Sequence, residues 1–246
     1  ALRVLLFKNN IAPDVDGTRG VQTFGCHENY LAKDIFTAYN QQSLIPFIIT
    51  RQIFDGTGSW DQDGNFFLSQ RARCVGSWRN IPLLINVKSS GRSPRVHLTY
   101  GDSSMLDMAA FLKIGTTSLM LSLLEGRCLP DITCADPMRI LLDVSRHDPL
   151  EKIIFINSKE KYSAHEIQVR YWEAARRACA GATFDSDETA AETEVIFIRW
   201  EQALNAIAAN DKEWMLGRFD RVTKQWLVER EIVRSGTHDT DGIAAI

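Results

Sequence analysis

The chain has 246 residues, of which 45% are hydrophobic and 24% charged, and its formal net charge is −3. This composition is typical of a globular protein whose core is large enough to fold without disulfides, and it excludes collagen-like, disordered and disulfide-scaffold classes. The charge balance gives a nucleic-acid partner no electrostatic support. No apolar run approaches the ~18 residues of a membrane span, so we expect neither nucleic acid nor membrane as a partner.

The five cysteines are odd in number, scattered, and never spaced as C-x-x-C. This pattern favours reduced thiols and argues against a zinc ribbon. The first eight residues lack the long apolar core of a secretion signal and are typical of a strand. The sequence therefore predicts a cytoplasmic protein.

The residues up to Gly101 are predicted to form mainly strands and loops. Apolar runs and apolar–polar alternation predict strands at residues 2–7, 26–32, 66–73, 81–87 and 95–100. Clusters of Gly, Asp and Pro predict loops at residues 11–23 and 55–65. Residues 43–54 fit either a helix, with Pro46 in its first turn, or a buried strand.

Helices are predicted for most of the remaining chain. A serine at 103 or 104 can cap a helix that ends before Gly126, and Pro137 suits the first position of the next helix. Ser163 and Glu166 form a capping box for a further helix. The predicted ranges are helices at 103–125, 136–146, 163–180, 194–209 and 211–234, the last interrupted at Gly217, and a hairpin at 152–162.

These elements predict an α+β fold, a mostly antiparallel sheet with helices packed on one face. We expect a single domain over residues 1–235, with residues 1–101 mainly strands and loops and residues 102–235 mainly helices. The tail at residues 236–246 has little to pack against and is predicted to be disordered.

Two neighbouring residues in the strand at 26–32 could carry chemistry. His27 offers a neutral imidazole and Glu28 a carboxylate, both of which can bind a divalent ion. Adjacent strand residues point to opposite faces, so only one of the two enters a given site easily. The alternative for His27 is a structural histidine. Cys26 beside it is not predicted to be a nucleophile, because no helix start lowers its thiol pKa.

Three further features have a chemical and a structural interpretation. Arg71, among apolar neighbours, is either a clamp for phosphate or carboxylate or a member of a structural ion pair. The junction at residues 101–104 is either an anion site or a helix cap, and the cap is favoured. The tryptophans of the helical region are interpreted as core packing. These residues alone indicate only an α+β domain with a polar sheet.

Two longer motifs are more specific, namely GCHENYL at residues 25–31 and LSQRA at residues 68–72. Shorter ones accompany them at residues 8–10, 50–52, 101–103, 112–117, 136–137, 144–148 and 219–224. Taken in this order, they resemble the Pup ligase and Pup deamidase/depupylase family over nearly the whole chain. Residues 61–64 and 199–201 look closer to the deamidase/depupylase branch.

The resemblance implies a carboxylate–amine ligase fold related to glutamine synthetase. In that fold a curved, mostly antiparallel sheet forms a cradle, and ATP and Mg²⁺ lie on its concave face. The ligases of the family make a glutamyl phosphate on the small modifier Pup and join it to a substrate lysine. The depupylases hydrolyse a side-chain amide or isopeptide bond.

Carried over position by position, the resemblance assigns several site residues. His27 matches a histidine near the metal ions, and Glu28 beside it is the second candidate metal ligand. Arg71 matches an arginine that faces phosphate, and Asn9 and Arg51 match recurring positions expected on the nucleotide side. Asp102 also matches a recurring position, without a role of its own. No catalytic residue is assigned.

The departures from the family pattern set a further expectation. The family's acidic N-terminal strand, its catalytic aspartate and its C-terminal domain have no counterpart, so the cradle is expected to be incomplete at both ends. A segment with a second metal-site histidine is shortened to residues 87–94, which hold neither histidine nor carboxylate. Magnesium prefers several oxygen ligands, whereas this chain offers mainly His27 and, as a second candidate, Glu28.

Three interpretations follow. The first is a subunit of a split, ATP- and Mg²⁺-dependent enzyme that acts on a carboxyl, side-chain amide or isopeptide group. A second polypeptide would then supply the acidic strand and the catalytic aspartate. The second is a non-catalytic family member that binds a peptide, a Pup-like tail or a partner protein. The third is the core of a longer enzyme.

Overall fold

The computed structural model describes residues 11–12, 22–23, 25–31, 42–61, 63–75, 85–90, 93–157 and 160–235. The strand predicted at residues 2–7, the candidate nucleotide ligand Asn9, and the tail at 236–246 lie outside the described residues. Residues 13–21 of the loop predicted at 11–23 and residues 81–84 of the strand predicted at 81–87 also lie outside the described residues.

A three-stranded antiparallel sheet positions the candidate site. Its order is β3 (Glu28–Leu31), β7 (Ser93–Leu98) and β6 (Ile85–Ser90). The alternation predicted for β3 is confirmed, because Glu28 is buried while Asn29 is exposed. Three two-stranded pairs complete the strands: β1 (Ile11–Ala12) with β2 (Gln22–Thr23), β4 (Ser59–Trp60) with β5 (Phe66–Phe67), and β8 (Ile154–Ile156) with β9 (Glu160–Tyr162).

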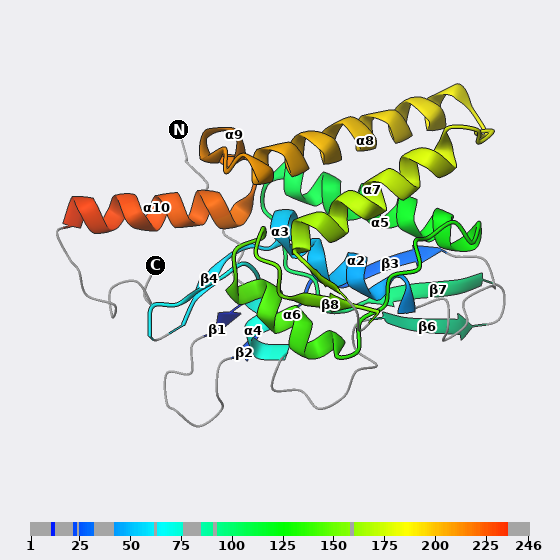
Figure 1. Cartoon of the computed structure of the whole chain (residues 1–246). Helices are drawn as coiled ribbons and strands as arrows, with labels where there is room; N and C mark the ends of the chain where they lie inside the picture. Colours follow the sequence, from blue (N-terminus) through cyan, green and yellow to red (C-terminus); the bar gives the residue numbers. More distant parts are fainter. Residues whose placement is uncertain are drawn as a thin grey trace.

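Helices cover one side of this sheet in two layers (Figure 1). The inner layer holds α2 (Ile45–Thr50), α3 (Gln52–Asp55) and α5 (Asp107–Glu125), and the outer layer holds α7 (Ala164–Cys179) and α8 (Asp187–Ala208). The segment at 43–54 is helical rather than a strand, and nearly all of it is buried, as expected for a helix surrounded by other elements. The α+β prediction is confirmed.

The core contains large aromatic side chains from both layers. The Phe47 ring meets the rings of Tyr171 and Trp200 edge to face, at centroid distances of 5.5 and 5.9 Å. Trp200 is fully buried, as predicted for the tryptophans, whereas Trp226 is 40% exposed. The interpretation of all the helical tryptophans as core residues is therefore wrong for Trp226.

Local capping signals correctly placed two helices. Asp136 caps α6 (Pro137–Arg146) by accepting from Arg139 N at 3.1 Å, and the Ser163–Glu166 capping box opens α7. The last helical region divides into α9 (Lys212–Met215) and α10 (Asp220–Ser235), and Gly217 has a positive φ between them.

Two sequence predictions are wrong at places where a side chain distant in sequence contacts the start of a helix. The serine cap predicted for α5 is absent, because Leu106 is its N-cap residue and Asp220 of α10 accepts from Met105 N at 2.8 Å. The strand predicted at 66–73 ends after β5, and α4 (Gln70–Val75) follows. In both places a carboxylate distant in sequence supplies the contact that decides the local structure.

By length and composition, α5 could cross a membrane, with a mean hydropathy of 1.3. Half of the relevant window is buried in the protein, and its buried residues include Lys113, Thr116 and Thr117. Core helices of globular domains have the same features, so this is weak evidence for a span.

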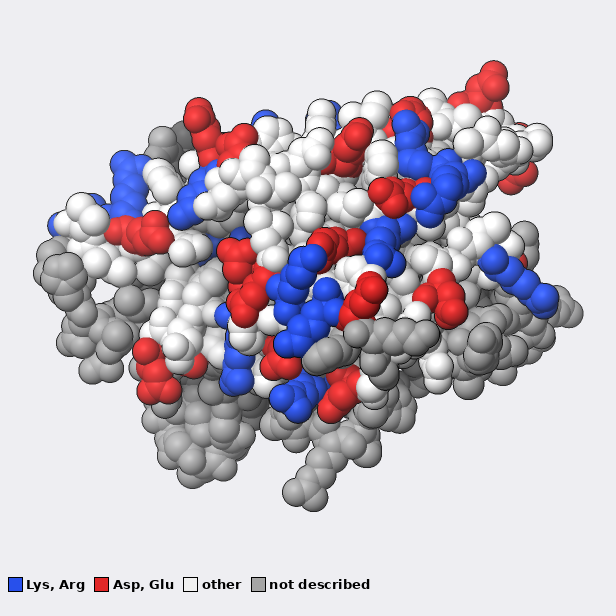
Figure 2. Space-filling model, viewed as in Figure 1, with Lys and Arg blue, Asp and Glu red and all other residues white. Residues whose placement is uncertain are grey.

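The surface carries charges of both signs, which are interleaved on the face shown in Figure 2. Some of these charges form ion pairs, such as that of Lys152 with Glu166 at 2.8 Å.

Candidate functional site

Asp102, just after β7, organises the start of α4. One carboxylate oxygen accepts from Gln70 N at 3.0 Å and Thr57 N at 2.9 Å, and the other accepts from Arg71 N and Ser69 Oγ, both at 3.0 Å. The carboxylate thus satisfies amide donors that a helix start leaves open, and its negative charge suits the helix dipole. Asp102 thereby fixes where α4 begins and where its first residues point.

This cap places Arg71 beside Gly25, at the beginning of the GCHENYL motif. Arg71 is 5% exposed. A Cβ added to Gly25 would lie 2.7 Å from the Arg71 Cζ and 2.6 Å from the carbonyl oxygen of Thr99, so only glycine fits there. The structure brings together Gly25 and Arg71, which lie more than 40 positions apart in the sequence. The prediction that Arg71 contacts phosphate stays a prediction, with a well-defined position.

Beneath β3, Glu28 and Arg51 form a buried ion pair. Arg51 is completely buried, and its two terminal nitrogens donate to the two carboxylate oxygens of Glu28, one of them at 3.0 Å. Tyr30 OH also donates to Glu28, at 2.6 Å. Burial acts to raise the pKa of Glu28, but Arg51, Lys113 and Tyr30 together keep it below its usual value.

These contacts give both residues a structural role. The Glu28 carboxylate is held by Arg51 and points away from the open face of the sheet, so the structure does not support it as a metal ligand. Arg51 also donates from Nε to Tyr100 OH at 3.1 Å, and it is directed into the core rather than toward a bound nucleotide. A direct contact of Arg51 with nucleotide remains a prediction without geometric support.

Asp55 adds a second carboxylate to Arg51. Its Oδ2 lies 2.9 Å from Arg51 Nε, but that N–H is directed to Tyr100, so the contact is an ion pair without an aligned hydrogen bond. Burial raises the pKa of Asp55 to about 6, and Arg51 and Lys113 counteract only part of this effect. The site is therefore built above a cluster of three buried carboxylates, on Glu28, Asp55 and Asp102, and two buried cations, on Arg51 and Lys113.

His27 lies on the opposite, open face, and sequence reasoning missed its neighbour. The Nδ1 of His27 is 3.1 Å from the Nε2 of His97, and the rings meet edge to face with centroids 4.9 Å apart. Because Asn29 pairs with His97 in the β3–β7 register, the two histidines share one face of the sheet. The signal was available in the sequence, since His97 alternates with the apolar residues Val96 and Leu98.

The described residues do not fit a Mg²⁺ ion. Among them, no group of three or more His, Cys, Asp or Glu side chains is arranged to hold a metal. His27 and His97 could act as two nitrogen ligands, whereas Mg²⁺ requires mainly oxygen ligands in octahedral geometry. A phosphate group suits the chemistry of Arg71 better, because a guanidinium offers planar, bidentate donors; in this structure that side chain is buried against Gly25.

Comparisons with known proteins bear on this arrangement. The family model described as Pup-ligase protein matches residues 1–245. The Pup–protein ligase of Acidimicrobium ferrooxidans is 32% identical over 242 residues, which cover 92% of this chain and 50% of that protein. The Pup–protein ligase of Corynebacterium diphtheriae is 32% identical over 252 residues, covering 97% and 51%.

Two solved structures share the fold. The Pup ligase PafA in complex with ADP has a TM-score of 0.80 and 26% identity, covering 98% of this chain and 55% of that chain. The complex between Pup and its ligase PafA has a TM-score of 0.78 and 26% identity, covering 89% and 48%. This chain therefore spans about half the length of the curated relatives it matches.

Proposed function

We propose that this chain, which belongs to the Pup ligase family, forms the nucleotide-binding cradle of an ATP-dependent enzyme that acts on the small protein modifier Pup. The observation that carries the proposal is the fold shared over 98% of the chain with a Pup ligase bound to ADP. Arg71 supports it, because the Asp102-capped helix holds its guanidinium beside Gly25, the first residue of the motif that also carries His27.

In the proposed reaction, ATP transfers its terminal phosphoryl group to a glutamate carboxylate of Pup and leaves as ADP. A lysine amine of the target protein then attacks the acyl phosphate, an isopeptide bond forms, and inorganic phosphate departs. The part assigned to this chain is to bind and orient the nucleotide phosphates through Arg71. The charge cluster below β3 keeps the floor rigid, because each member is held by buried partners.

We assign the ligase reaction ahead of depupylation. The curated relatives and solved structures described above are ligases. The deamidase/depupylase branch rests on residues 61–64 and 199–201 alone and remains a prediction. The described residues lack a set of acidic metal ligands, so other residues must supply these ligands in the active enzyme. A second polypeptide chain that carries them remains one prediction for their source. We expect the enzyme in the cytoplasm, where ATP is available.

A conjugation assay tests this function. The protein is purified from its own source and incubated with ATP, Mg²⁺, Pup and a lysine-rich target protein, and the products are weighed by mass spectrometry. A ligase yields a conjugate one water lighter than the sum of Pup and target, with one ADP per conjugate. Release of Pup from a preformed conjugate identifies a depupylase instead. If neither product forms and no nucleotide binds, the result favours the alternative that the chain is a non-catalytic family member that binds a peptide or partner protein.

A matched pair of variants connects the assay to the site. Arg71→Gln removes the phosphate-facing charge and is expected to weaken nucleotide binding about 10- to 100-fold, the loss typical of a charge-assisted hydrogen bond. Arg139→Gln removes the same charge from a side chain that is 78% exposed on α6 and should leave binding unchanged. Equal binding by wild type and Arg71→Gln would remove Arg71 from the proposed site.

A further inference from the structure

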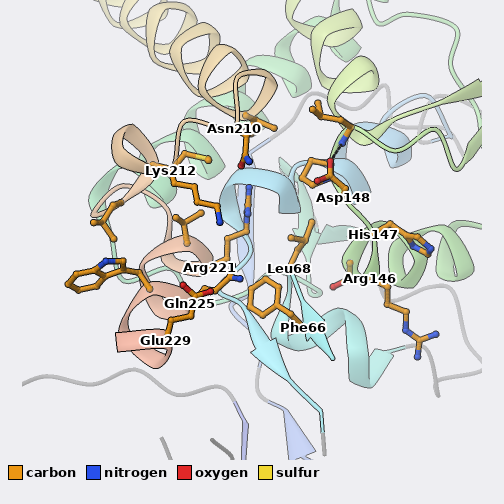
Figure 3. Close-up of a pocket in the computed structure, with 18 of the residues that line it drawn as sticks. Phe66, Leu68, Arg146, His147, Asp148, Asn210, Lys212, Arg221, Gln225 and Glu229 are labelled. Atoms are coloured by element: carbon orange, nitrogen blue, oxygen red, sulfur yellow. Dashed lines mark hydrogen bonds between the residues drawn. The ribbon is translucent and has the colours of Figure 1, made fainter. Parts of the chain in front are cut away.

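A cavity of about 690 Å³ lies away from the open sheet face, between the start of α10, α9, β5 and the residues after α6 (Figure 3). Its volume falls within the range of small-molecule sites, roughly 300–1,000 Å³. Neither His27, His97 nor Arg71 lines it. The cavity is therefore distinct from the site assigned to nucleotide.

Arg221, in the first turn of α10, is the charged group at the centre of this cavity. It is 8% exposed, and its Nε donates to the carbonyl oxygen of Ile53 at 2.9 Å. Among the residues that the structure describes, no carboxylate lies within ion-pairing distance of it and no acceptor is bonded to its other guanidinium donors. Figure 3 shows its tip directed toward Lys212 and Asn210.

This environment is unfavourable for a cation. Burial lowers the pKa of Arg221 to about 10, and the carboxylate of Asp148 opposes this only in part. A buried charge without an ion-pair partner destabilises a fold, and an anion seated against it removes that cost. Lys212 contributes a second, exposed positive charge to the cavity, whereas Figure 3 shows Arg146 pointing away from Arg221.

The rest of the lining defines the class of ligand. Apolar side chains form part of the wall, namely Phe66, Leu68, Ile207, Met215, Leu216, Val222 and Trp226. Asp148 and Glu229 also line the cavity and would repel a polyanion such as a nucleotide. We propose that the cavity binds a small organic acid with one anionic group, a carboxylate or a phosphate, which pairs with Arg221 while its apolar body contacts this wall.

Calorimetric titration of the full chain with benzoate and with phenyl phosphate tests the proposal, and inorganic phosphate serves as the probe without an apolar body. At least one aromatic probe should bind more tightly than inorganic phosphate, and comparison of the two identifies the preferred anionic group. Arg221→Gln should weaken that binding at least about tenfold, the loss of one charge-assisted hydrogen bond. No heat from either aromatic probe at millimolar concentration would overturn the proposal.

Two other variants keep the test decisive if Arg221→Gln does not fold. Asp148→Asn removes an exposed, repelling carboxylate and should tighten binding about two- to fivefold, whereas Lys212→Gln should weaken it by a similar factor. Arg177→Gln, with a side chain that is 71% exposed on α7, is the charge-matched control and should change nothing. Arg71→Gln should also change nothing, which separates this cavity from the nucleotide site. Unaltered binding in both Asp148→Asn and Lys212→Gln, or a loss in Arg71→Gln, would contradict the assignment.

Discussion

The buried charge cluster beneath β3 predicts a specific dependence of stability on pH. It holds three carboxylates, on Glu28, Asp55 and Asp102, and the cations of Arg51 and Lys113. Burial, reinforced by the other two carboxylates, raises the pKa of Asp55 to about 6. Substituting Asp55 by asparagine removes this titration while keeping nearly the same side-chain shape.

The magnitude follows from the difference between the ordinary value of 3.8 and the folded pKa of about 6. At about 1.4 kcal/mol per pH unit, ionising Asp55 in the folded protein costs about 3 kcal/mol. Since the folded pKa is the higher one, the folded protein binds more protons than the unfolded chain in this interval. Stability falls as pH rises through about 6 and levels off above it. Between about pH 5 and pH 7.5 the loss is about 1.4 kcal/mol.

Urea unfolding of wild type and Asp55→Asn at these two pH values measures the effect. We expect the wild type to lose about 1.4 kcal/mol more than the variant on going to the higher pH, with the variant the more stable protein there. Groups common to both proteins cancel in this comparison, and both pH values lie above 4.5, the ordinary pKa of Glu28, so that residue stays ionised. Identical pH dependence in the two proteins would refute the raised pKa of Asp55.

Three other changes have defined outcomes. Gly101→Ala places a Cβ 2.9 Å from Glu28 Oε1 and should lower the free energy of unfolding by about 1–3 kcal/mol. Gly181→Ala is the control, because open space surrounds that position and the protein should not be destabilised. Equal unfolding midpoints for the two variants would contradict the close packing at Gly101. Asp102→Ala removes the cap of α4 and should lower the free energy of unfolding by at least about 3 kcal/mol. Asp136→Ala, which removes the cap of α6, should lower it by about 1 kcal/mol. Thermal unfolding measures both, and a reversed order would contradict the organising role of Asp102. Glu28→Gln should lower the apparent pKa of the cluster and flatten the pH profile, and an unchanged profile would count against electrostatic coupling.

The elements that the sequence predicted best carry their signals locally. The alternation in β3, the capping box at Ser163 and the cap at Asp136 each depend on residues within one turn or one strand. Residues 43–54 fit both a helix and a buried strand because this largely apolar run has no clear period, and the structure shows two short helices there. The strand predicted over 66–73 is confirmed only at Phe66–Phe67, and its second half is wrong because α4 begins there, with amide donors bonded to Asp102 more than 30 residues away.

The candidate site was predictable only in part, for the same reason. His27 and Arg71 were identified, but the sequence did not show that Arg51 would turn inward, because its partner Glu28 lies 23 residues earlier. His97 was not recognised until the β3–β7 register placed it beside His27. Arg221 carried no motif, and its cavity is assembled from segments distant in sequence. Residue types can be read from the chain, whereas the pairing of charges is a tertiary property.

Native mass spectrometry of the protein purified from its own source, without denaturation, tests the central claim most directly. The account predicts a species that retains the mass of ADP or ATP, or that takes up one nucleotide when ATP and Mg²⁺ are added. Nucleotide binding should be about 10- to 100-fold weaker in Arg71→Gln and unchanged in Arg139→Gln. The same spectrum reports whether a second polypeptide accompanies the chain. A protein that binds no nucleotide at millimolar ATP, alone or with whatever copurifies, would contradict the assignment of this fold as a working ATP cradle.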